Sequence, residues 1–566
     1  MFANSGSKRS LVVAAAVIMA AVMVLGVTPV LPAQAQTQGE PQAVAAQAGC
    51  SVELQGGADE NSAAPIGVVG DAIEANPLCT NFVLRGHFDG KGPLRITRPL
   101  TLTGPIGSGI IPPVLWGSTV LVHAVDVTVQ RLEFREQLSS AIWIGRLPNS
   151  THPGIRADGA RIEFNKFSDT FKSGSFGGGV IRVAGVDNSV PSNSSEPIRI
   201  RFNEILNFGR NDRVYRGDDP NIDSIPTRFF HGIMIGQNRL RFDGSFAPYT
   251  LTPARKEVTT ANGSVSSEPV RVIVNSNIIE TSKTWGSGYT SAIQAYDPTY
   301  IAHNCIAGTD IGIEIKSNEN IVTGNRLYRV VGRNRHASGA ALYQRDGDLN
   351  RYTNNLVVQS GMGFEAYSGS HNVFSGNLVM GSRRAIGRIH GAYHSGNRAE
   401  ENLADINLTP AEAGITLEEP DHLTGQTSFR FAAEHTLIAN NSFVNNNGGL
   451  LWKAPEAGRL ELPNNFYLVR NIFDRGRKAD TPNQTVMHIR ELPRAATVSL
   501  EDELRAQNFQ VGNVLDGDFS WTRGATDNVS RSLTEADSVP REWNRFTGRG
   551  EAGAKPGVAA NAPKCF

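Results

Sequence analysis

Asparagines recur along this chain in one local pattern, and this repeat limits the possible folds more than any other feature. The motif is N-x-[apolar], as in FNKF, GNRL and RNIF, and its asparagines are Asn165, Asn203, Asn277, Asn304, Asn325, Asn355, Asn377, Asn397, Asn441 and Asn471. The last seven gaps are 27, 21, 30, 22, 20, 44 and 30 residues. A unit of about 22 residues, with insertions of variable size and one doubled interval, explains these gaps and predicts a solenoid.

A short alternating segment precedes most of these asparagines by about a dozen residues. These segments are GIEI at Gly312, ALYQ at Ala341, GFEA at Gly363 and AIGR at Ala385. Each opens on Gly or Ala, as a strand does when one face is buried and the chain bends at both ends. No amphipathic helix pattern lies between them, which excludes βαβ units.

The prediction is therefore an all-β chain: a right-handed, single-stranded parallel β-helix with surface loops, whose asparagines stack from coil to coil in a hydrogen-bonded ladder. A β-propeller is the alternative. Its blades need about 40 to 45 residues each and more aromatic residues than the 7% of this chain.

The N-terminus predicts export. Lys8 and Arg9 precede an apolar run over residues 11–27, and Ala33-Gln34-Ala35 resembles a cleavage site. We expect a cleaved signal peptide over residues 1–35, a mature start near Gln36, and a secreted or periplasmic protein with no membrane segment in the mature form. An uncleaved anchor is the alternative.

The rest of the chain divides into three predicted parts. Residues 36–83 form an N-terminal cap or linker, residues 84–516 the β-helix, and residues 517–566 a C-terminal tail. Three interruptions rich in Ser, Pro, Gly or charge are expected as surface loops, namely Ala184–Pro197, Arg241–Pro269 and Thr409–Glu434.

Charge and cysteine content narrow the classes of partner. Lys and Arg number 54, and so do Asp and Glu, so the zero net charge gives no bulk attraction to nucleic acid and any polyanion site must be local. In an oxidising compartment Cys50 and Cys79 are a possible disulfide, whereas Cys305 is expected to be a buried thiol. The four cysteines show no zinc-ligand spacing.

Stacking the strands places charged residues in columns about 4.8 Å apart. When IEIKS, LYQRD and FEAYS are aligned by apolar alternation, Ile313, Leu342 and Phe364 point inward. The outward residues then form two columns. One contains Glu314, Tyr343 and Glu365, and the other contains Lys316, Arg345 and Tyr367. Arg388 or His390 of the next coil and His371 of an adjacent turn lie nearby.

A lysine beside an arginine is costly unless an anion visits, and the like charge favours the neutral amine, which is a base. This outward face therefore predicts a reaction surface for an anionic, hydroxyl-rich ligand, with Lys316 as proton acceptor and Arg345 and Tyr367 as donors. The structural alternative is a solvated face whose charges pair along the column, Glu314 with Lys316 and Glu365 with Arg345.

The stretches IEIKSNENIVTGN and LYQRDGDLNRYTNN resemble the paired signatures of polysaccharide lyase family 6, which includes alginate lyases and chondroitinase B. HGIMIGQNRLRF and GFEAYSGSHNVFSGN are more distant matches, and the pieces fit that family in order over roughly residues 85–475. The resemblance implies the pectin-lyase-like form of the β-helix and β-elimination on an acidic polysaccharide such as alginate or a glycosaminoglycan.

Carried over by motif, Lys316 is the base and Arg345 assists departure of the C4 oxygen. The other outward side chains of this face are the predicted substrate contacts: Tyr343, Glu365, Tyr367, His371, Arg388 and His390. The 29-residue step from Lys316 to Arg345 requires the segment from Arg333 to bulge out, since a displaced strand would remove Arg345 from the site.

The resemblance also implies a Ca²⁺ ion that neutralises the substrate carboxylate. Calcium-binding members carry E-x-E shortly before the lysine, whereas this chain has GTDIGIEIKS, with its two carboxylates four residues apart. The candidate oxygen ligands for a hard cation are Asn277, Glu280, Asp310 and Glu314. The alternative is that these residues have a structural role in turns.

Three other functions fit the same pattern. One is a non-catalytic β-helix that binds glycans or serves as an exported structural module. Another is a glycoside hydrolase that uses Glu314 and Glu365, which lie two coils apart. The third is an epimerase, which needs a second proton donor across the sugar ring, with His371 or Tyr367 as candidates.

Overall fold

The computed structural model describes residues 50–90, 92–137, 140–145, 157–170, 178–184, 196–209, 229–236, 255–259, 265–269, 272–281, 289–332, 339–367, 369–390 and shorter pieces up to residue 530. The chain divides into two units, Met1–Gly49 and Cys50–Phe566, and every described residue belongs to the second. The expected signal peptide lies outside the described residues.

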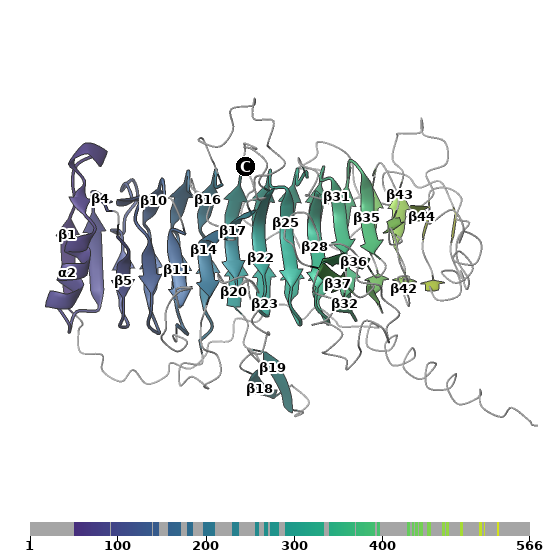
Figure 1. Cartoon of the computed structure of the whole chain (residues 1–566), viewed down its shortest axis with the longest axis horizontal. Coiled ribbons are helices and arrows are strands. Elements are labelled where there is room, and N and C mark those ends of the chain that lie inside the picture. Colours follow the sequence, from purple (N-terminus) through teal and green to yellow (C-terminus); the bar gives the residue numbers. More distant parts are fainter. Residues whose placement is uncertain are drawn as a thin grey trace, which may run out of the picture. The chain divides into compact units, whose positions relative to one another are not determined.

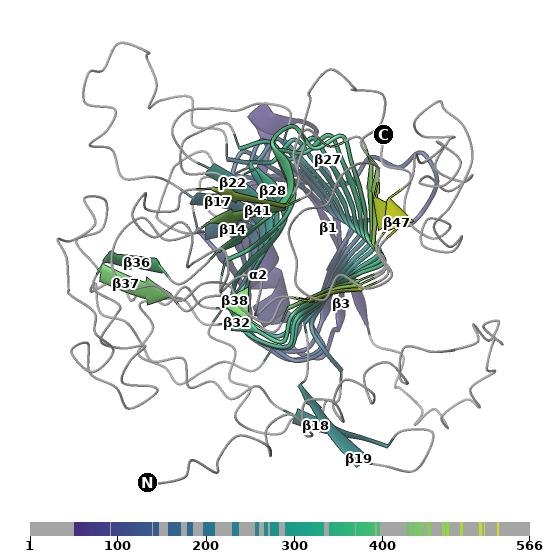
Figure 2. The same ribbon diagram turned by 90° about the vertical axis from the view of Figure 1, so that its right-hand side faces the viewer.

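Three parallel sheets form the molecule, and each turn of the chain contributes one strand to each sheet (Figure 1). Seen along the stack, the sheets are the faces of a parallel β-helix (Figure 2). This architecture confirms the predicted fold, with three strands per coil where the asparagine pattern had indicated two. The domain boundaries at residues 84 and 516 stay predictions.

The three sheets contain the following strands. The first consists of β1 (Ser51–Gln55), β3 (Asn81–Arg85), β6 (Thr101–Thr103), β9 (Thr128–Gln130), β12 (Arg161–Glu163), β15 (Arg199–Arg201), β20 (Val272–Asn275), β23 (Thr299–Ala302), β26 (Ile321–Thr323), β29 (Arg351–Thr353), β33 (Val373–Ser375), β39 (Leu437–Ala439), β42 (Tyr467–Val469) and β45 (Phe509–Val511). The second consists of β2 (Ala64–Pro65), β4 (His87–Asp89), β7 (Val114–Trp116), β10 (Glu133–Arg135), β13 (Lys166–Ser168), β16 (Glu204–Leu206), β21 (Ile278–Glu280), β24 (Cys305–Ala307), β27 (Arg326–Tyr328), β30 (Leu356–Val358), β34 (Leu378–Met380), β40 (Ser442–Val444), β43 (Ile472–Asp474), β46 (Val514–Leu515) and β47 (Val529–Ser530). The third consists of β5 (Leu94–Ile96), β8 (Val120–Val122), β11 (Ile142–Gly145), β14 (Gly178–Ala184), β17 (Phe229–Ile235), β22 (Tyr289–Ala295), β25 (Ile311–Lys316), β28 (Ala340–Asp346), β31 (Met362–Ala366), β35 (Ala385–His390), β41 (Leu450–Lys453) and β44 (Met487–Arg490).

Short strands outside the coils lie within two of the expected loops or pair with strands there. β18 (Arg255–Thr259) and β19 (Val265–Pro269) form an antiparallel ribbon. β36 (Tyr393–Gly396) pairs antiparallel with β37 (Thr427–Arg430), and β32 (Gly369–Ser370) pairs parallel with β38 (Ala433–Glu434).

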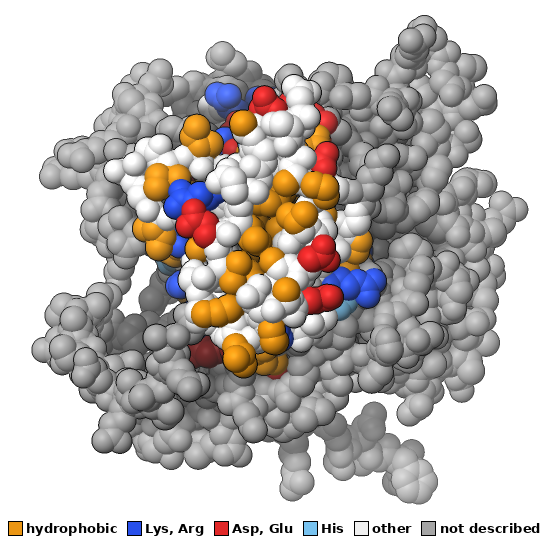
Figure 3. Space-filling model, turned by 90° about the vertical axis from the view of Figure 1, so that its left-hand side faces the viewer, with side chains coloured by type: hydrophobic (Ala, Val, Ile, Leu, Met, Phe, Trp, Pro, Cys, Tyr) orange, Lys and Arg blue, Asp and Glu red, His pale blue; other side chains and the backbone are white. Residues whose placement is uncertain are grey.

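The first coil is capped by helix α2 (Gly67–Ala75), which follows the short 3-10 turn η1 (Glu60–Ser62). Val69 and Ile73 of α2 are buried in the apolar core that continues through the coils. Arg98 donates hydrogen bonds to the carbonyls of Ile73 and Asn76 at the end of the helix, where the last turn has carbonyls without intrahelical partners. Figure 3 shows this end of the stack, with apolar and charged side chains interspersed over the face.

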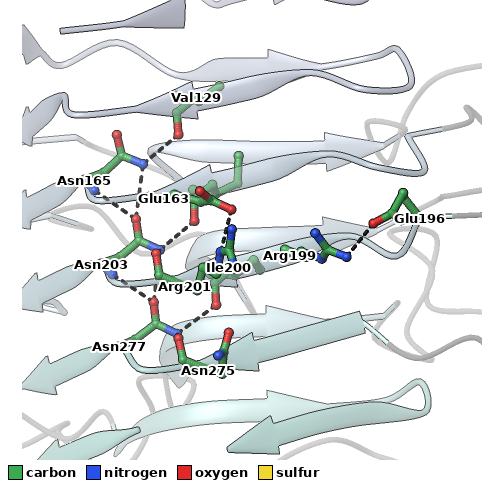
Figure 4. A network of polar contacts seen from close by, with 11 residues as sticks. Val129, Glu163, Asn165, Glu196, Arg199, Ile200, Arg201, Asn203, Asn275 and Asn277 are labelled. Carbon is green, nitrogen blue, oxygen red and sulfur yellow. Dashed lines mark hydrogen bonds and ion pairs between the residues drawn. The ribbon is translucent and has the colours of Figure 1, made fainter. Parts of the chain in front are cut away.

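The asparagine ladder lies at the corner between the first and second sheets. The backbone N–H and the side-chain amide of Asn304 both donate to Oδ1 of Asn325, each at 3.0 Å. Figure 4 shows the same arrangement from Asn165 through Asn203 to Asn277. Because each amide satisfies backbone and side chain of its neighbour, the column buries polar groups at little cost.

One member of the predicted ladder is wrong. Asn377 donates directly to Asn441, so no further asparagine lies between them, and Asn397 is outside the described residues. The span from Asn377 to Asn441, predicted as one repeat of 20 residues followed by one doubled interval of 44 residues, is one coil with a long insertion. The remaining nine asparagines of the motif form one continuous ladder, as predicted.

Two disulfide predictions have different outcomes. Cys50 and Cys79 are bonded, which ties β1 to the start of β3. Cys305 is also disulfide-bonded, to a partner outside the described residues, so the prediction of a buried thiol is wrong. Separately, none of the helices within the described residues has the length and apolarity to cross a membrane.

Candidate functional site

The outward face of the third sheet carries the residues that the sequence singled out. Ile313 pairs with Leu342, and Leu342 with Phe364, which are all buried in the core. Glu314 therefore lies beside Tyr343 on the opposite face of the sheet, as the alternation predicted. The insertion before β28 does not displace the strand, so Arg345 stays at the site.

A bulge changes the second predicted column. The register between β25 and β28 shifts after Ile315, so that Lys316 pairs with Asp346 and Arg345 becomes the extra residue. Bulges re-aim side chains, and this one turns the Arg345 guanidinium back toward the previous coil. There it meets Glu314 rather than standing directly over Lys316.

Glu314 is the centre of the site. Its carboxylate is fully buried, and its Oε1 forms an ion pair with Lys316 Nζ at 3.2 Å and accepts a hydrogen bond from Arg345 Nη1 at 3.1 Å. Its other oxygen accepts a 2.6 Å hydrogen bond from Gln294 Nε2 on the preceding coil. Burial by itself would raise the pKa of Glu314, but the two cations outweigh burial and hold this pKa at about 2. Glu314 is thus a fixed negative charge.

The two cations converge because they share one oxygen atom. Their nitrogens can lie no further apart than 6.3 Å, the sum of the contact distances of 3.2 Å and 3.1 Å. The side chains of Lys316 and Arg345 are 12% and 31% exposed, so solvent or a ligand reaches both while Glu314 stays covered. Lys316 Nζ also donates to the hydroxyl of Tyr296 at 2.8 Å.

Three residues of this site were missed by the sequence analysis. Gln294 pairs directly with Glu314 in the ladder of β22 and β25, Tyr296 follows β22, and His231 of β17 is fully buried nearby. Burial lowers the pKa of His231 to about 3, so its imidazole is neutral at physiological pH. Extending the column alignment backward by one coil would have found Gln294.

Farther along the same face, Arg182 of β14 stacks over the indole of Trp143 of β11, with its guanidinium carbon 4.4 Å from the ring centroid. Burial lowers the pKa of Arg182 to about 10, so it remains charged. The face thus carries positive charge on coils well before Lys316.

The second carboxylate of the predicted hydrolase pair is also bound by a cation. Glu365 Oε1 accepts from Arg388 Nη2 at 2.6 Å and Nε at 2.9 Å. Burial opposes the charge on Arg388, but Glu365 outweighs it and raises the pKa of Arg388. The structural alternative paired Glu314 with Lys316, which the structure shows, and Glu365 with Arg345, whereas the structure brings Arg388 to Glu365 and Arg345 to Glu314.

Aromatic side chains line the same face. Tyr343 and Tyr367 meet edge to face with ring centroids 6.1 Å apart, over an apolar cluster that includes Ile311 and Met362. Of the two predicted histidine contacts, His371 lies exposed in the turn between β32 and β33, and His390 ends β35 with its side chain outside the described part.

The predicted calcium ligands do not fit a shared cation site. Asn277 is a member of the ladder, and Glu280 ends a strand of the second sheet. Asp310 accepts two hydrogen bonds from Thr290, while both oxygens of Glu314 are taken. In the described part of the chain, no three His, Cys, Asp or Glu side chains lie close enough to hold a metal ion. These four side chains therefore do not form a common calcium site.

Comparison with known proteins finds similarity in solved structures alone. No protein-family model and no curated protein matches the chain. A mannuronic acid specific polysaccharide lyase family 6 enzyme from human gut microbiota is 13% identical, with 88% of this chain and 93% of that chain covered and a TM-score of 0.46. A family 6 alginate lyase in complex with a trisaccharide is 12% identical, with 87% and 90% covered and a TM-score of 0.45.

A mutant of the periplasmic alginate epimerase AlgG is also similar, at 13% identity, with 80% of this chain and 78% of that chain covered and a TM-score of 0.32. The resemblance to family 6 lyases is thus confirmed as a similarity along most of the chain, at low identity. At this level of sequence identity, the similarity does not assign a function to the site.

Proposed function

We propose that this protein is a carbohydrate-active enzyme that cleaves an acidic polysaccharide by β-elimination, with Lys316 as the base. One observation carries the proposal: Lys316 and Arg345 are held on the same oxygen of a fully buried carboxylate, and both stay within reach of a ligand. Elimination from a uronate needs a base at C5 and positive charge for the carboxylate and the leaving oxygen. This pair supplies both within a few ångströms.

The proposed step uses three side chains. The neutral amine of Lys316 takes the C5 proton, the electron pair forms the C4–C5 double bond, and the C4–O bond breaks. Arg345 donates hydrogen bonds to the developing negative charge, because a guanidinium keeps its proton. The leaving oxygen takes a proton from the hydroxyl of Tyr296, and the Lys316 ammonium returns one to Tyr296 along their 2.8 Å hydrogen bond.

The buried carboxylates argue against hydrolysis. A glycoside hydrolase needs one carboxylic acid that is protonated at working pH. The pKa of Glu314 is about 2 because Lys316 and Arg345 outweigh its burial, so this carboxyl holds no proton to give. Glu365 is bound by both nitrogens of the Arg388 fork. Neither carboxylate is positioned to protonate a leaving sugar.

The rest of the face suits a chain of acidic sugars. Tyr343 and Tyr367 offer aromatic surface, and Arg388, whose side chain is 28% exposed, lies three coils from Glu314. We assign these residues to substrate binding, with His371 and His390 at the edge of the same face. The expected partner is a uronate polysaccharide, alginate among them, which agrees with an exported protein.

The test is absorbance near 235 nm, where unsaturated sugars absorb, with the mature protein on alginate, pectate, chondroitin sulfate and heparin, each with Ca²⁺ and with EDTA. We expect one polymer to give a signal that falls at least about 10³-fold in Lys316→Ala and in Arg345→Ala. Lys166→Ala is the matched control, because Lys166 also contacts a buried glutamate, at 3.7 Å, but on the second sheet.

A flat trace on every polymer by a folded protein would overturn the lyase proposal in favour of a non-catalytic glycan-binding β-helix. Turnover without a new absorbance, followed by proton exchange at C5 in deuterated water, would indicate epimerisation instead. A signal that survives in Lys316→Ala would assign the base to another residue.

A further inference from the structure

A second feature lies at the corner between the first and second sheets, away from the Glu314 face. One residue per coil takes the left-handed backbone conformation there, and on several coils it is small or polar, as at Ser276 and Asn354. On two neighbouring coils it is phenylalanine, at Phe164 with φ 56° and Phe202 with φ 57°. This conformation costs a bulky residue on the order of 1 kcal/mol. Something must offset that cost.

Burial in the core does not offset it. Phe164 is 47% exposed and Phe202 43% exposed, whereas the core phenylalanines are fully buried. The two rings stack on each other, with centroids 5.0 Å apart and planes within 10°. Part of their apolar surface is thus left facing solvent in a parallel pair.

Two arginines flank the stacked rings. The guanidinium carbon of Arg131 lies 5.4 Å from the centroid of Phe164, and that of Arg201 lies 5.5 Å from the centroid of Phe202. Arg201 is paired with Glu163 at 2.6 Å, as Figure 4 shows. The Arg131 side chain makes no hydrogen bond or ion pair with any residue that the structure describes. An available cation therefore stands beside an exposed aromatic pair.

We propose that Arg131, Phe164, Phe202 and Arg201 form a binding site for a carboxylate-bearing polysaccharide, separate from the Glu314 site. Aromatic rings bind the apolar faces of sugars, and a guanidinium matches a carboxylate in a two-point hydrogen bond. The four residues span consecutive coils about 4.8 Å apart, so an extended chain can contact them in series. We name this surface the corner site.

The corner site takes its ligand class from the proposed function but does not depend on elimination. It would hold a long polymer on the enzyme while the Glu314 face acts on another part of the chain. Such a site raises the apparent affinity for polymer more than that for short oligosaccharides, because only the polymer reaches both surfaces.

The test is migration in native gels that contain alginate or carboxyl-reduced alginate, with all variants built on Lys316→Ala and product absorbance followed in the same samples. Phe164→Asn with Phe202→Asn removes the rings but keeps a residue type that this corner accepts, as Asn354 shows. We expect about tenfold weaker retardation by alginate, from loss of ring contacts, and a smaller loss for Arg131→Gln. Carboxyl-reduced alginate should retard all variants weakly and alike.

Leu78→Asn is the matched control, because Leu78 is an apolar side chain that is 88% exposed and lies near the helix cap. It should leave retardation unchanged. A second control is Ile106→Ser with Ile111→Ser, since both isoleucines are exposed in the loop after β6, which ends at the same corner.

Unchanged retardation of the folded phenylalanine variant would overturn the corner site. So would an equal effect on the carboxyl-reduced polymer. If sedimentation instead shows an oligomer that dissociates in the phenylalanine variant, the rings join copies of the chain and the proposal is wrong. None of these outcomes depends on whether the Glu314 face eliminates, because binding and product are read separately.

Discussion

In the part of the chain that the structure describes, two buried glutamates each contact one lysine and one arginine, and one of the two forms a candidate site. Glu314 lies on the third sheet with Lys316 and Arg345, and Glu133 lies on the second with Arg135 at 2.7 Å and Lys166 at 3.7 Å. Both glutamates begin the same short motif, with a cation two residues later and another on the next coil.

The difference between the two clusters is the environment of the cations. Around Glu133, the Arg135 and Lys166 side chains are 40% and 43% exposed, whereas Lys316 is only 12% exposed and is further fixed by Tyr296. Opposite charges at an exposed position are screened by water, so their energy and geometry are weakly defined. Composition alone therefore does not identify a site, whereas fixed and partly desolvated cations do.

The largest effect that we expect separates the two clusters by activity. Glu314→Gln removes the charge that positions Lys316 and Arg345, and we expect the elimination rate to fall by about 10². Glu133→Gln should stay within about twofold, because surface-type pairs contribute little. The measurement is kcat on the polymer that gives the absorbance signal. Equal losses in both variants would mean that Glu314 acts through stability alone.

The pH profile of that reaction sharpens the same comparison. The negative charge of Glu314 favours the ammonium form of Lys316, so Glu314→Gln should shift the rising limb of rate against pH to lower pH. A merely structural role would lower the rate without moving this limb.

The Glu314 cluster should also contribute to stability against acid. The pKa of Glu314 is about 2 in the folded chain, where the two cations outweigh burial, against an ordinary value of 4.5. A depressed pKa gives stability that is complete above pH 4.5 and is lost as pH falls from 4.5 to 2, here on the order of 3 kcal/mol. Chemical denaturation from pH 6 to 2.5 should show this loss in the wild type and a flatter curve in Glu314→Gln. A slope unchanged by that substitution would contradict the assignment.

A neutral control comes from the asparagine ladder. Asn304→Ala removes the oxygen that accepts from the backbone N–H and the side-chain amide of Asn277, and one of the two donors to Oδ1 of Asn325, which should cost about 2 kcal/mol. Because no charge is involved, the loss in free energy of unfolding should be the same at pH 4 and pH 7. A pH-dependent loss would show that the ladder is coupled to a titrating group.

The ladder was predictable because it repeats. Each asparagine bonds the same residue type on the next coil, so the period along the sequence is the period in space, and nine of the ten predicted members are confirmed. The prediction failed at Asn397, where a long insertion contains an asparagine in the same motif. Spacing alone does not separate a coil from a loop of similar length.

The charged cluster was only partly predictable, because it does not repeat. Lys316, Arg345 and Glu314 were identified from one aligned pair of strands. The bulge that turns Arg345 toward Glu314 has no sequence signature, and Tyr296 and Gln294 belong to a coil outside the aligned motifs. The exposed Phe164 and Phe202 were likewise missed, because their left-handed backbone is defined by the corner and not by their own preferences.

The smallest effect concerns salt. Raising NaCl from about 0.1 M to 0.5 M shortens the screening length from about 10 Å to about 4 Å, which weakens exposed pairs most. The destabilisation by Glu133→Gln should shrink by a few tenths of a kcal/mol, because Arg135 and Lys166 are substantially exposed. That by Glu314→Gln should change less, since its carboxylate is fully buried. Thermal unfolding of both variants and the wild type at the two salt concentrations measures this difference. An equal salt response of the two variants would mean that the cations of the Glu314 face are as well solvated as those of the second sheet.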